Sequence, residues 1–133
     1  MATIKSFEEL EIWQMAREFS KLIFKLSSSG EFTRDFKFKS QILSAAGSIM
    51  DNIAEGFERG GKLEFIQFLS IAKGSCGETQ SQVYRASDFK YINEDELIDL
   101  QNSAKELGNK IGNLISYLNK SLIKGSKFKD RRT

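Results

Sequence analysis

Apolar residues recur at three- and four-residue steps along most of this chain, which is the spacing of amphipathic α-helices. The first such stretch predicts a helix over residues 7–26, with Ser6 as its N-cap and Glu9 completing a capping box. Its inward face is expected to carry Phe7, Leu10, Trp13, Ala16, Phe19, Ile23 and Leu26.

A second helix is predicted to begin at Thr33 or Asp35 and to end at Arg59. Gly60 and Gly61 follow, and glycine is favoured just beyond a helix because it adopts positive φ at no steric cost. Small residues at positions 44–48 predict close packing against a neighbouring helix. The inward face is expected to carry Phe38, Ile42, Ala45, Ala46, Ile49, Ile53 and Phe57.

A third helix is predicted over residues 62–90, and it holds more apolar residues than one buried stripe can use. Seven of the ten positions at 63–72 are apolar, whereas a single stripe uses about half of them. The surplus must face either a neighbouring helix on each side or another subunit, and we expect self-assembly. We expect the oligomer interface to include Phe65, Phe68 and Ile71.

A fourth helix is predicted over residues 93–124, with Asn93 as its N-cap. Its apolar residues form a heptad seam, so the chain is expected to fold as an all-α, up-down antiparallel four-helix bundle. The seam consists of Leu97, Leu100, Ala104, Leu107, Ile111, Leu114 and Leu118.

Charge divides the chain into a nearly neutral body and a basic end. Residues 1–123 have a net charge of −2, and residues 124–133 have a net charge of +4. We expect the first range to be the bundle domain and the second a disordered tail. Such a tail is either a solvated end or a contact for nucleic acid. The candidate contacts are Lys124, Lys127, Lys129, Arg131 and Arg132.

The composition argues against an enzyme and against a membrane protein. The chain has no His and one Cys, so the usual imidazole base and nucleophile pairs are missing, and we expect no enzymatic activity, no cofactor and no metal. No stretch is apolar enough to span a membrane, and the first ten residues are too polar for a signal peptide. A single Cys76 fits a reducing, cytoplasmic location.

Two polar groups allow a structural and a functional interpretation. Asn52 and Glu55 share one helix face, and we favour a structural role in which Glu55 accepts hydrogen bonds from the start of the third helix. The alternative is a polar site inside the bundle. The aromatic and basic residues near the end of the third helix either close the bundle or contact nucleic acid. They are Tyr84, Arg85, Phe89, Lys90 and Tyr91.

The central segment resembles a known bacterial family. It reads AAGSIMDNIAEGFERGGKLEFIQFLSIAKGSCGETQ, and it is similar to four-helix bundle proteins encoded in intervening sequences of 23S ribosomal RNA genes. That family includes the accessory variability determinant of diversity-generating retroelements. Asn52, Glu55 and Gly56 belong to the family motif and are expected to be structural. The full motif falls on Ser48, Ile49, Asn52, Ile53, Ala54, Glu55 and Gly56, and on Phe65, Phe68, Leu69, Ala72, Gly74 and Ser75.

The resemblance implies a homopentameric barrel of bundles without known enzymatic activity. For the retroelement member it implies binding to nucleic acid and to a reverse transcriptase. We therefore expect an oligomeric scaffold or accessory protein that binds RNA or DNA, or a nucleoprotein partner, weakly. Relatives commonly carry Arg where this chain has Leu43 and Ser44, which lowers the charge of the body. The alternative is an interaction module whose apolar surface serves only self-assembly.

Overall fold

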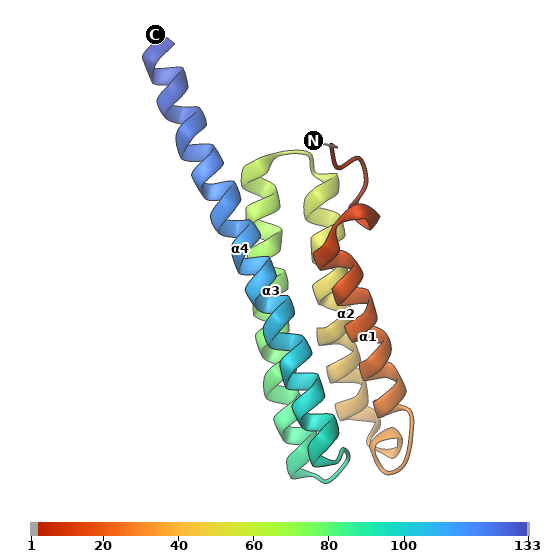
Figure 1. Ribbon diagram of the computed structural model, residues 1–133. Coiled ribbons are helices and arrows are strands. Elements are labelled where there is room, and N and C mark those ends of the chain that lie inside the picture. The colour runs from red at the N-terminus through yellow and green to blue at the C-terminus, as the bar shows by residue number, and fades with distance from the viewer. Residues whose placement is uncertain (1–2, 133) are drawn as a thin grey trace.

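The computed structural model describes the backbone of residues 3–132 and the side chains of residues 3–122. Four α-helices run alternately up and down in one bundle (Figure 1), and residues 3–132 contain no strand. Each helix contacts the next along the chain, and the last returns to contact the first. The predicted four-helix bundle is therefore confirmed. Its helices are α1 (Glu11–Ser27), α2 (Phe36–Glu58), α3 (Lys62–Asp88) and α4 (Glu94–Arg132).

Small residues at the centre of the bundle bring the four helices close together. Each helix contributes an alanine with no exposed surface, and these are Ala16, Ala46, Ala72 and Ala104. Larger side chains fill the layers above and below them. The seam of α4 is buried as predicted at Leu100, Ala104, Leu107, Ile111 and Leu118. On α2 the predicted inward face is buried except for Phe57, which is half-buried.

The predicted helix over residues 7–26 is broken near its start. A 3-10 turn, η1 (Phe7–Glu9), is followed by extended backbone at Leu10, and only then does α1 begin. The Ser6 side chain makes no capping bond, and Glu9 instead accepts a hydrogen bond from the Lys5 N–H at 2.7 Å. The expected capping box is therefore wrong.

The break at Leu10 allows an aromatic contact that a continuous helix would forbid. The rings of Phe7 and Trp13 meet edge to face, with their centroids 5.1 Å apart. Residues six apart in a helix lie on different faces and cannot touch. The energy of this contact accounts for a break that no Gly or Pro signals in the sequence.

Of the two predicted starts of the second helix, Asp35 is correct. Its carboxylate accepts a hydrogen bond from the Phe38 N–H at 3.2 Å and caps α2. A second 3-10 turn, η2 (Phe32–Arg34), precedes it and buries Phe32. Tyr91 donates its hydroxyl proton to the same carboxylate at 2.8 Å, so one acid both starts α2 and ties it to the far end of α3.

The two remaining turns use the residues that the sequence indicates. Gly60 has a φ of +83°, as expected for a glycine that ends α2. Asn93 caps α4 by accepting from the Glu96 N–H at 2.8 Å, and Glu96 accepts from the Asn93 N–H at 2.8 Å. The predicted cap is confirmed, and Glu96 completes a capping box. The third helix ends at Asp88 rather than Lys90, because Lys90 adopts a φ of +63°.

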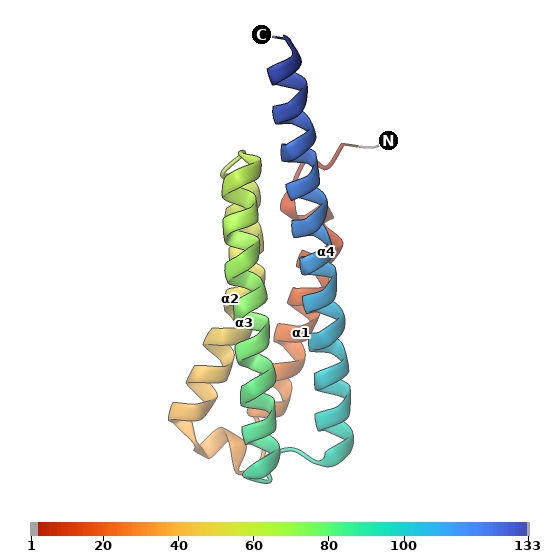
Figure 2. The same ribbon diagram turned by 90° about the vertical axis from the view of Figure 1, so that its left-hand side faces the viewer.

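The fourth helix is longer than predicted. It continues to Arg132 rather than ending near Lys124, and it projects past the turn between α2 and α3 (Figures 1 and 2). No Pro stops it, and most residues of this stretch are good helix formers. The side chains of residues 123–133 lie outside the described part, so the division into a bundle and a disordered tail at 123/124 stays a prediction.

We expect Ala46→Leu to overpack the bundle, because Ala46 has no exposed surface between the helices. The free energy of unfolding, measured by urea denaturation, should fall by about 1–3 kcal/mol. Gly47→Ala is the matched control, since beyond its chain neighbours and the local backbone of α2 nothing described lies within 4 Å of the added methyl group. An unchanged midpoint for Ala46→Leu would contradict the packing described above.

Candidate functional site on the outer face of α2 and α3

A chain of polar contacts joins α2 to α3 at mid-height. The hydroxyl oxygens of Ser48 and Ser75 lie 3.0 Å apart, one from each helix. Asn52 donates its amide protons to the carbonyl oxygen and the hydroxyl oxygen of Ser48, both at 2.8 Å. Asn52 therefore holds the Ser48 hydroxyl in place. This supports the structural role that we expected for Asn52.

Close contact between α2 and α3 also depends on Gly56. A Cβ atom added at Gly56 would lie 2.6 Å from the Cβ of Phe68 and 3.1 Å from Cδ1 of Phe65. The first distance is far below van der Waals contact, and a Cβ atom cannot move without its backbone. Gly56 thus sets the distance between the two helices, which is a structural role.

Glu55 does not play the part that we expected. Among the described residues it accepts no hydrogen bond from the start of α3, and it forms an ion pair with Arg59 at 3.4 Å instead. The helix geometry explains this. Successive residues point about 100° apart, so when Gly56 faces α3 its neighbour Glu55 turns towards solvent. Both side chains of the pair are half exposed, so the pair adds little stability.

Two of the three predicted interface residues also pack within the subunit. Phe65 meets Phe57 of α2 edge to face at 6.0 Å, and the Arg59 guanidinium lies 5.2 Å above the ring of Phe68. Both rings are half-buried. Ile71 differs from them because half of its surface (51%) is exposed.

The outer face of α3 is largely uncharged, and Glu78 and Arg85 border it where it meets the groove towards α2. Its exposed apolar residues are Leu63 near the start of α3, Ile71 in the middle and Tyr84 near the end. Between them, small or neutral residues recur at three- and four-residue steps. We call this surface the α3 face; it consists of Leu63, Gln67, Ser70, Ile71, Gly74, Gly77, Ser81 and Tyr84.

Two glycines of the α3 face have no explanation within the subunit. A Cβ atom added at Gly74 or Gly77 would meet nothing within 4 Å. Each glycine inside an exposed helix costs about 1 kcal/mol relative to alanine. Gly108 and Gly112 of α4 are different, since their added Cβ atoms would touch Cys76 and Lys73 of α3.

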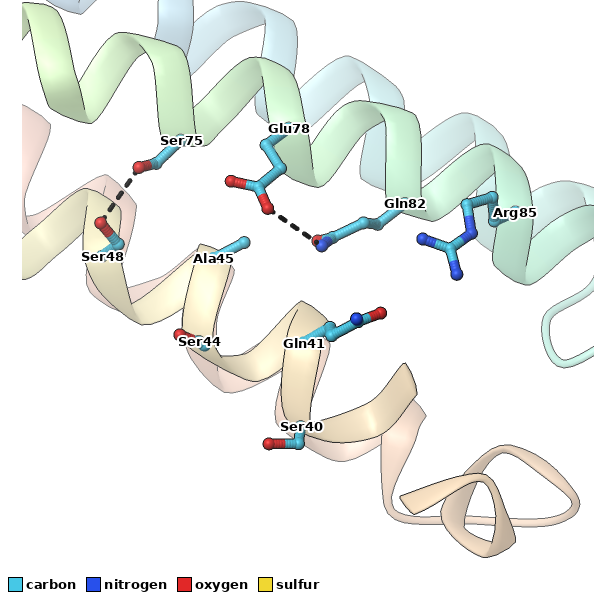
Figure 3. Close-up of a pocket in the computed structure, with 9 residues that line it drawn as sticks. All are labelled: Ser40, Gln41, Ser44, Ala45, Ser48, Ser75, Glu78, Gln82 and Arg85. Carbon is cyan, nitrogen blue, oxygen red and sulfur yellow. Dashed lines mark hydrogen bonds between the residues drawn. The ribbon is translucent and has the colours of Figure 1, made fainter. Parts of the chain in front are cut away.

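A polar groove of about 490 Å³ runs beside the α3 face, between α2 and α3 (Figure 3). Gln82 reaches into it from α3 and is only 5% exposed. Its Nε2 donates to a Glu78 carboxylate oxygen at 3.4 Å, but its Oε1 is buried without a hydrogen-bond partner among the described residues. The other lining residues are Ser40, Gln41, Ser44, Ala45, Ser48, Ser75 and Arg85.

The aromatic residues near the end of α3 mostly close the bundle. Tyr91 stacks on Phe32 at 5.1 Å, and Phe89 meets Phe38 edge to face at 5.8 Å. Arg85 lies 4.5 Å above the ring of Phe38. The bond from Tyr91 to Asp35 raises the pKa of the Tyr91 hydroxyl, because it is made only by the protonated phenol. The bundle-closing interpretation is thereby supported for these residues.

The described residues offer little for catalysis. Cys76 is buried and donates its thiol proton to the Ala104 carbonyl at 3.1 Å. Burial raises the pKa of this thiol, which makes it a poor nucleophile. Among the side chains of residues 3–122 no group of three acidic or Cys residues is placed to hold a metal ion. No described helix is both long and apolar enough to cross a membrane.

The predicted nucleic-acid contacts lie outside the described side chains. They are Lys124, Lys127, Lys129, Arg131 and Arg132, and the structure gives only the backbone of this stretch as the end of α4. The sequence patterns also missed Gln82 and Gly77, whereas Gly74 belongs to the family motif. Glycines repeated on the exposed side of a predicted helix were a usable signal, whereas the unpartnered amide of Gln82 required coordinates.

These features define an all-α four-helix bundle with a polar groove and an uncharged helix face. A family model described as the 23S rRNA-intervening sequence protein matches residues 8–113, so the chain belongs to that family. A solved structure from the S23 ribosomal protein family of Bacteroides thetaiotaomicron VPI-5482 is similar, with a TM-score of 0.71. It is 23% identical over 78% of this chain and 97% of that chain, which shows the fold alone. No curated relative matches the sequence.

We expect Gly56→Ala to destabilise the subunit, because its methyl group would clash with the Cβ of Phe68. Forcing the helices apart should lower the free energy of unfolding by about 1–3 kcal/mol in urea titrations. Gly47→Ala, on the same helix but with open space, should not destabilise it. Equal stability of the two variants would show that α2 and α3 do not need this close contact.

Proposed function

We propose that the protein is a non-enzymatic, homo-oligomeric scaffold or accessory protein that binds nucleic acid weakly. The exposed α3 face is the main observation in favour of self-assembly. Exposed Leu63, Ile71 and Tyr84 lose contact with water when a neighbour covers them, and Gly74 and Gly77 let a neighbouring backbone come close. Without a neighbour, both glycines only weaken α3.

The polar groove supports a second copy of the chain on the same side of the bundle. An acceptor that is buried without a partner costs free energy, and the unpaired Oε1 of Gln82 is such an acceptor. A donor from a neighbouring subunit would pair it. Five subunits is the number that the family resemblance implies, and a reverse transcriptase or another nucleoprotein is the partner that the retroelement members imply.

The nucleic-acid part of the proposal is based on charge. Residues 124–133 have a net charge of +4, and they follow a helix that projects beyond the bundle (Figure 2). An oligomer collects several such ends on one particle, which raises their avidity if they lie on one side. Lysine and arginine contacts to phosphates carry no sequence preference, so we propose binding to RNA or DNA of any sequence.

A second candidate function is self-assembly without any nucleic-acid role. The net charge of −2 over residues 1–123 favours it, because a negative body repels a polyanion. Leu43 and Ser44 favour it as well, since neither residue can pair with a phosphate charge. The two candidates share the α3 face and differ only in the part played by the tail.

Ile71→Asp should break the assembly, because it places a charge in the centre of the α3 face. We expect light scattering at micromolar concentration to give a closed oligomer, five subunits by our proposal, for the wild type and smaller species for Ile71→Asp. Ile98→Asp is the matched control, since Ile98 on α4 is exposed to the same extent, 50% against 51%. Circular dichroism should show that both variants remain helical.

Gly74→Ala separates the two roles of the glycine. In an isolated subunit it should raise stability by about 1 kcal/mol, because alanine is the better helix former. In an assembly with a close neighbour it should weaken association instead. A monomeric wild type, or an oligomer that Ile71→Asp leaves unchanged, would rule out assembly through the α3 face.

A neutral-tail variant tests the contribution of the basic residues to nucleic-acid binding. It replaces all five by Gln at constant length: K124Q/K127Q/K129Q/R131Q/R132Q. The wild type should bind a labelled single strand at low salt and lose about a hundredfold in affinity between 50 and 200 mM salt, if all five residues contact phosphates. The variant should bind at least about tenfold more weakly at 50 mM, with a shallower salt dependence. Equal binding of the two proteins would exclude the tail as the contact.

A further inference from the structure

Two phenylalanines stand in solvent at the end of the bundle that lies far from the C-terminus (Figure 1). Phe24 near the end of α1 is 58% exposed, and Phe36 at the start of α2 is 80% exposed. Both lie outside the three- and four-residue stripes that form the core. Both rings therefore stay in water, whereas Phe32, Phe38 and Phe89 at the same end of the bundle pack against other aromatic rings.

One basic side chain lies against the Phe24 ring, and others stand close to both phenylalanines along the chain. The Lys39 ammonium lies 5.8 Å from the centre of the Phe24 ring and donates to the Thr33 hydroxyl at 3.2 Å, so it is held against the ring. Phe36 stands three residues before Lys39 and therefore beside it on α2. We call this area the basic–aromatic surface; it consists of Lys21, Phe24, Arg34, Phe36, Lys37 and Lys39.

The charge of this region contrasts with that of the remaining body. Residues 20–40 hold five basic and two acidic residues. Residues 3–19 and 41–122 together hold ten basic and fifteen acidic residues. Residues 20–40 are thus a positive segment in an otherwise negative body, and the sign of this segment suits a polyanion. The acidic first turn of α4 lies at the same end of the bundle (Figure 1), and Glu96 and Asp99 line a groove there with Lys25.

The acidic groups nearby leave most of this positive charge available. Glu18 pairs with Lys21 at 3.1 Å, but both side chains are largely exposed and the pair is weak. Asp35 already accepts bonds from a backbone amide and a tyrosine hydroxyl. Glu31 is exposed and forms no ion pair in the described part of the chain. Lys25 is not counted in the surface, because it lines the groove between α1 and α4.

We infer that the basic–aromatic surface binds single-stranded nucleic acid, with bases stacked on the two phenyl rings and phosphates beside the lysines. Exposed rings interleaved with cations are what sequence-independent single-strand binders present. A duplex keeps its base faces stacked inside and could use only the charges. A second copy of this positive surface would be repelled, whereas the uncharged α3 face is free of that repulsion.

This inference rests on the proposed nucleic-acid function but assigns it to a second place in the molecule. The surface and the basic tail lie at opposite ends of the subunit (Figure 1), so either can be removed without the other. The basic–aromatic surface and the basic tail should also contribute to binding in different ways. Stacking on a ring depends little on salt, whereas phosphate contacts weaken steeply with it.

The test measures fluorescence anisotropy of a labelled 20-nucleotide polyuridine strand and of a labelled 20-base-pair RNA duplex at 50 mM salt. The neutral-tail variant is the parent, so that the tail does not mask the surface. Phe24→Ala with Phe36→Ala should lower single-strand affinity by about tenfold or more and leave the salt dependence nearly unchanged. Lys37→Gln with Lys39→Gln should lower both the affinity and its salt dependence.

Matched controls come from the same subunit. Tyr117→Ala removes an aromatic ring that is 66% exposed on α4, and Lys73→Gln with Lys105→Gln removes two exposed cations elsewhere. Both controls should bind like the parent. Light scattering should give the same mass for all variants, since the surface is not an assembly contact.

Three results would overturn the inference while leaving the proposed function standing, as long as the wild type binds nucleic acid. They are a parent that does not bind the single strand, phenylalanine variants that bind like the parent, and a duplex that binds as tightly as the strand. A changed mass in the phenylalanine variants would assign the surface to a protein partner and would overturn it too. A wild type that binds neither probe would overturn both this inference and the nucleic-acid function.

Discussion

The structure depends on how closely α2 can approach α3. Gly56 lies against the Cβ of Phe68, and the hydroxyl groups of Ser48 and Ser75 meet where larger side chains would keep the helices apart. Because α2 and α3 come this close, large apolar side chains do not fit between them on the outer side of the bundle. Polar side chains therefore line the groove outside the contact, and the amide of Gln82 is trapped there by packing rather than by its own bonds.

The same constraint explains why α3 is the unusual helix of the four. It is packed against α2 on one side and α4 on the other, so small residues such as Ala72 suit both contacts. Its third side faces solvent and has no neighbour in the subunit. Large aliphatic side chains and unsupported glycines on that side reduce the stability of an isolated subunit, and both become favourable only against another surface. The proposed assembly would cover this side of α3 with another subunit.

The helices and most of the core could be predicted from the sequence, because burial on one side of a helix leaves a strict three- and four-residue period. Failures occurred where a contact between distant residues decided the local structure. The edge-to-face pair of Phe7 and Trp13 breaks the helix at Leu10, and the orientation of Gly56 turns Glu55 away from α3. No local pattern contains that information. The candidate surfaces were harder to predict, because they consist of residues that have no packing partner in the subunit.

The two candidate surfaces differ in charge and lie at different places on the bundle. The basic–aromatic surface around Phe36 and the α3 face occupy different parts of one subunit. A polyanion is attracted to basic residues and repelled by acidic ones, so the acidic start of α4 directs it towards the α1 and α2 side of that end. The proposed assembly contact in the middle of α3 would stay free when a strand binds the basic–aromatic surface. By these two proposals a subunit could assemble and bind a strand at the same time, because the two partners would use different surfaces.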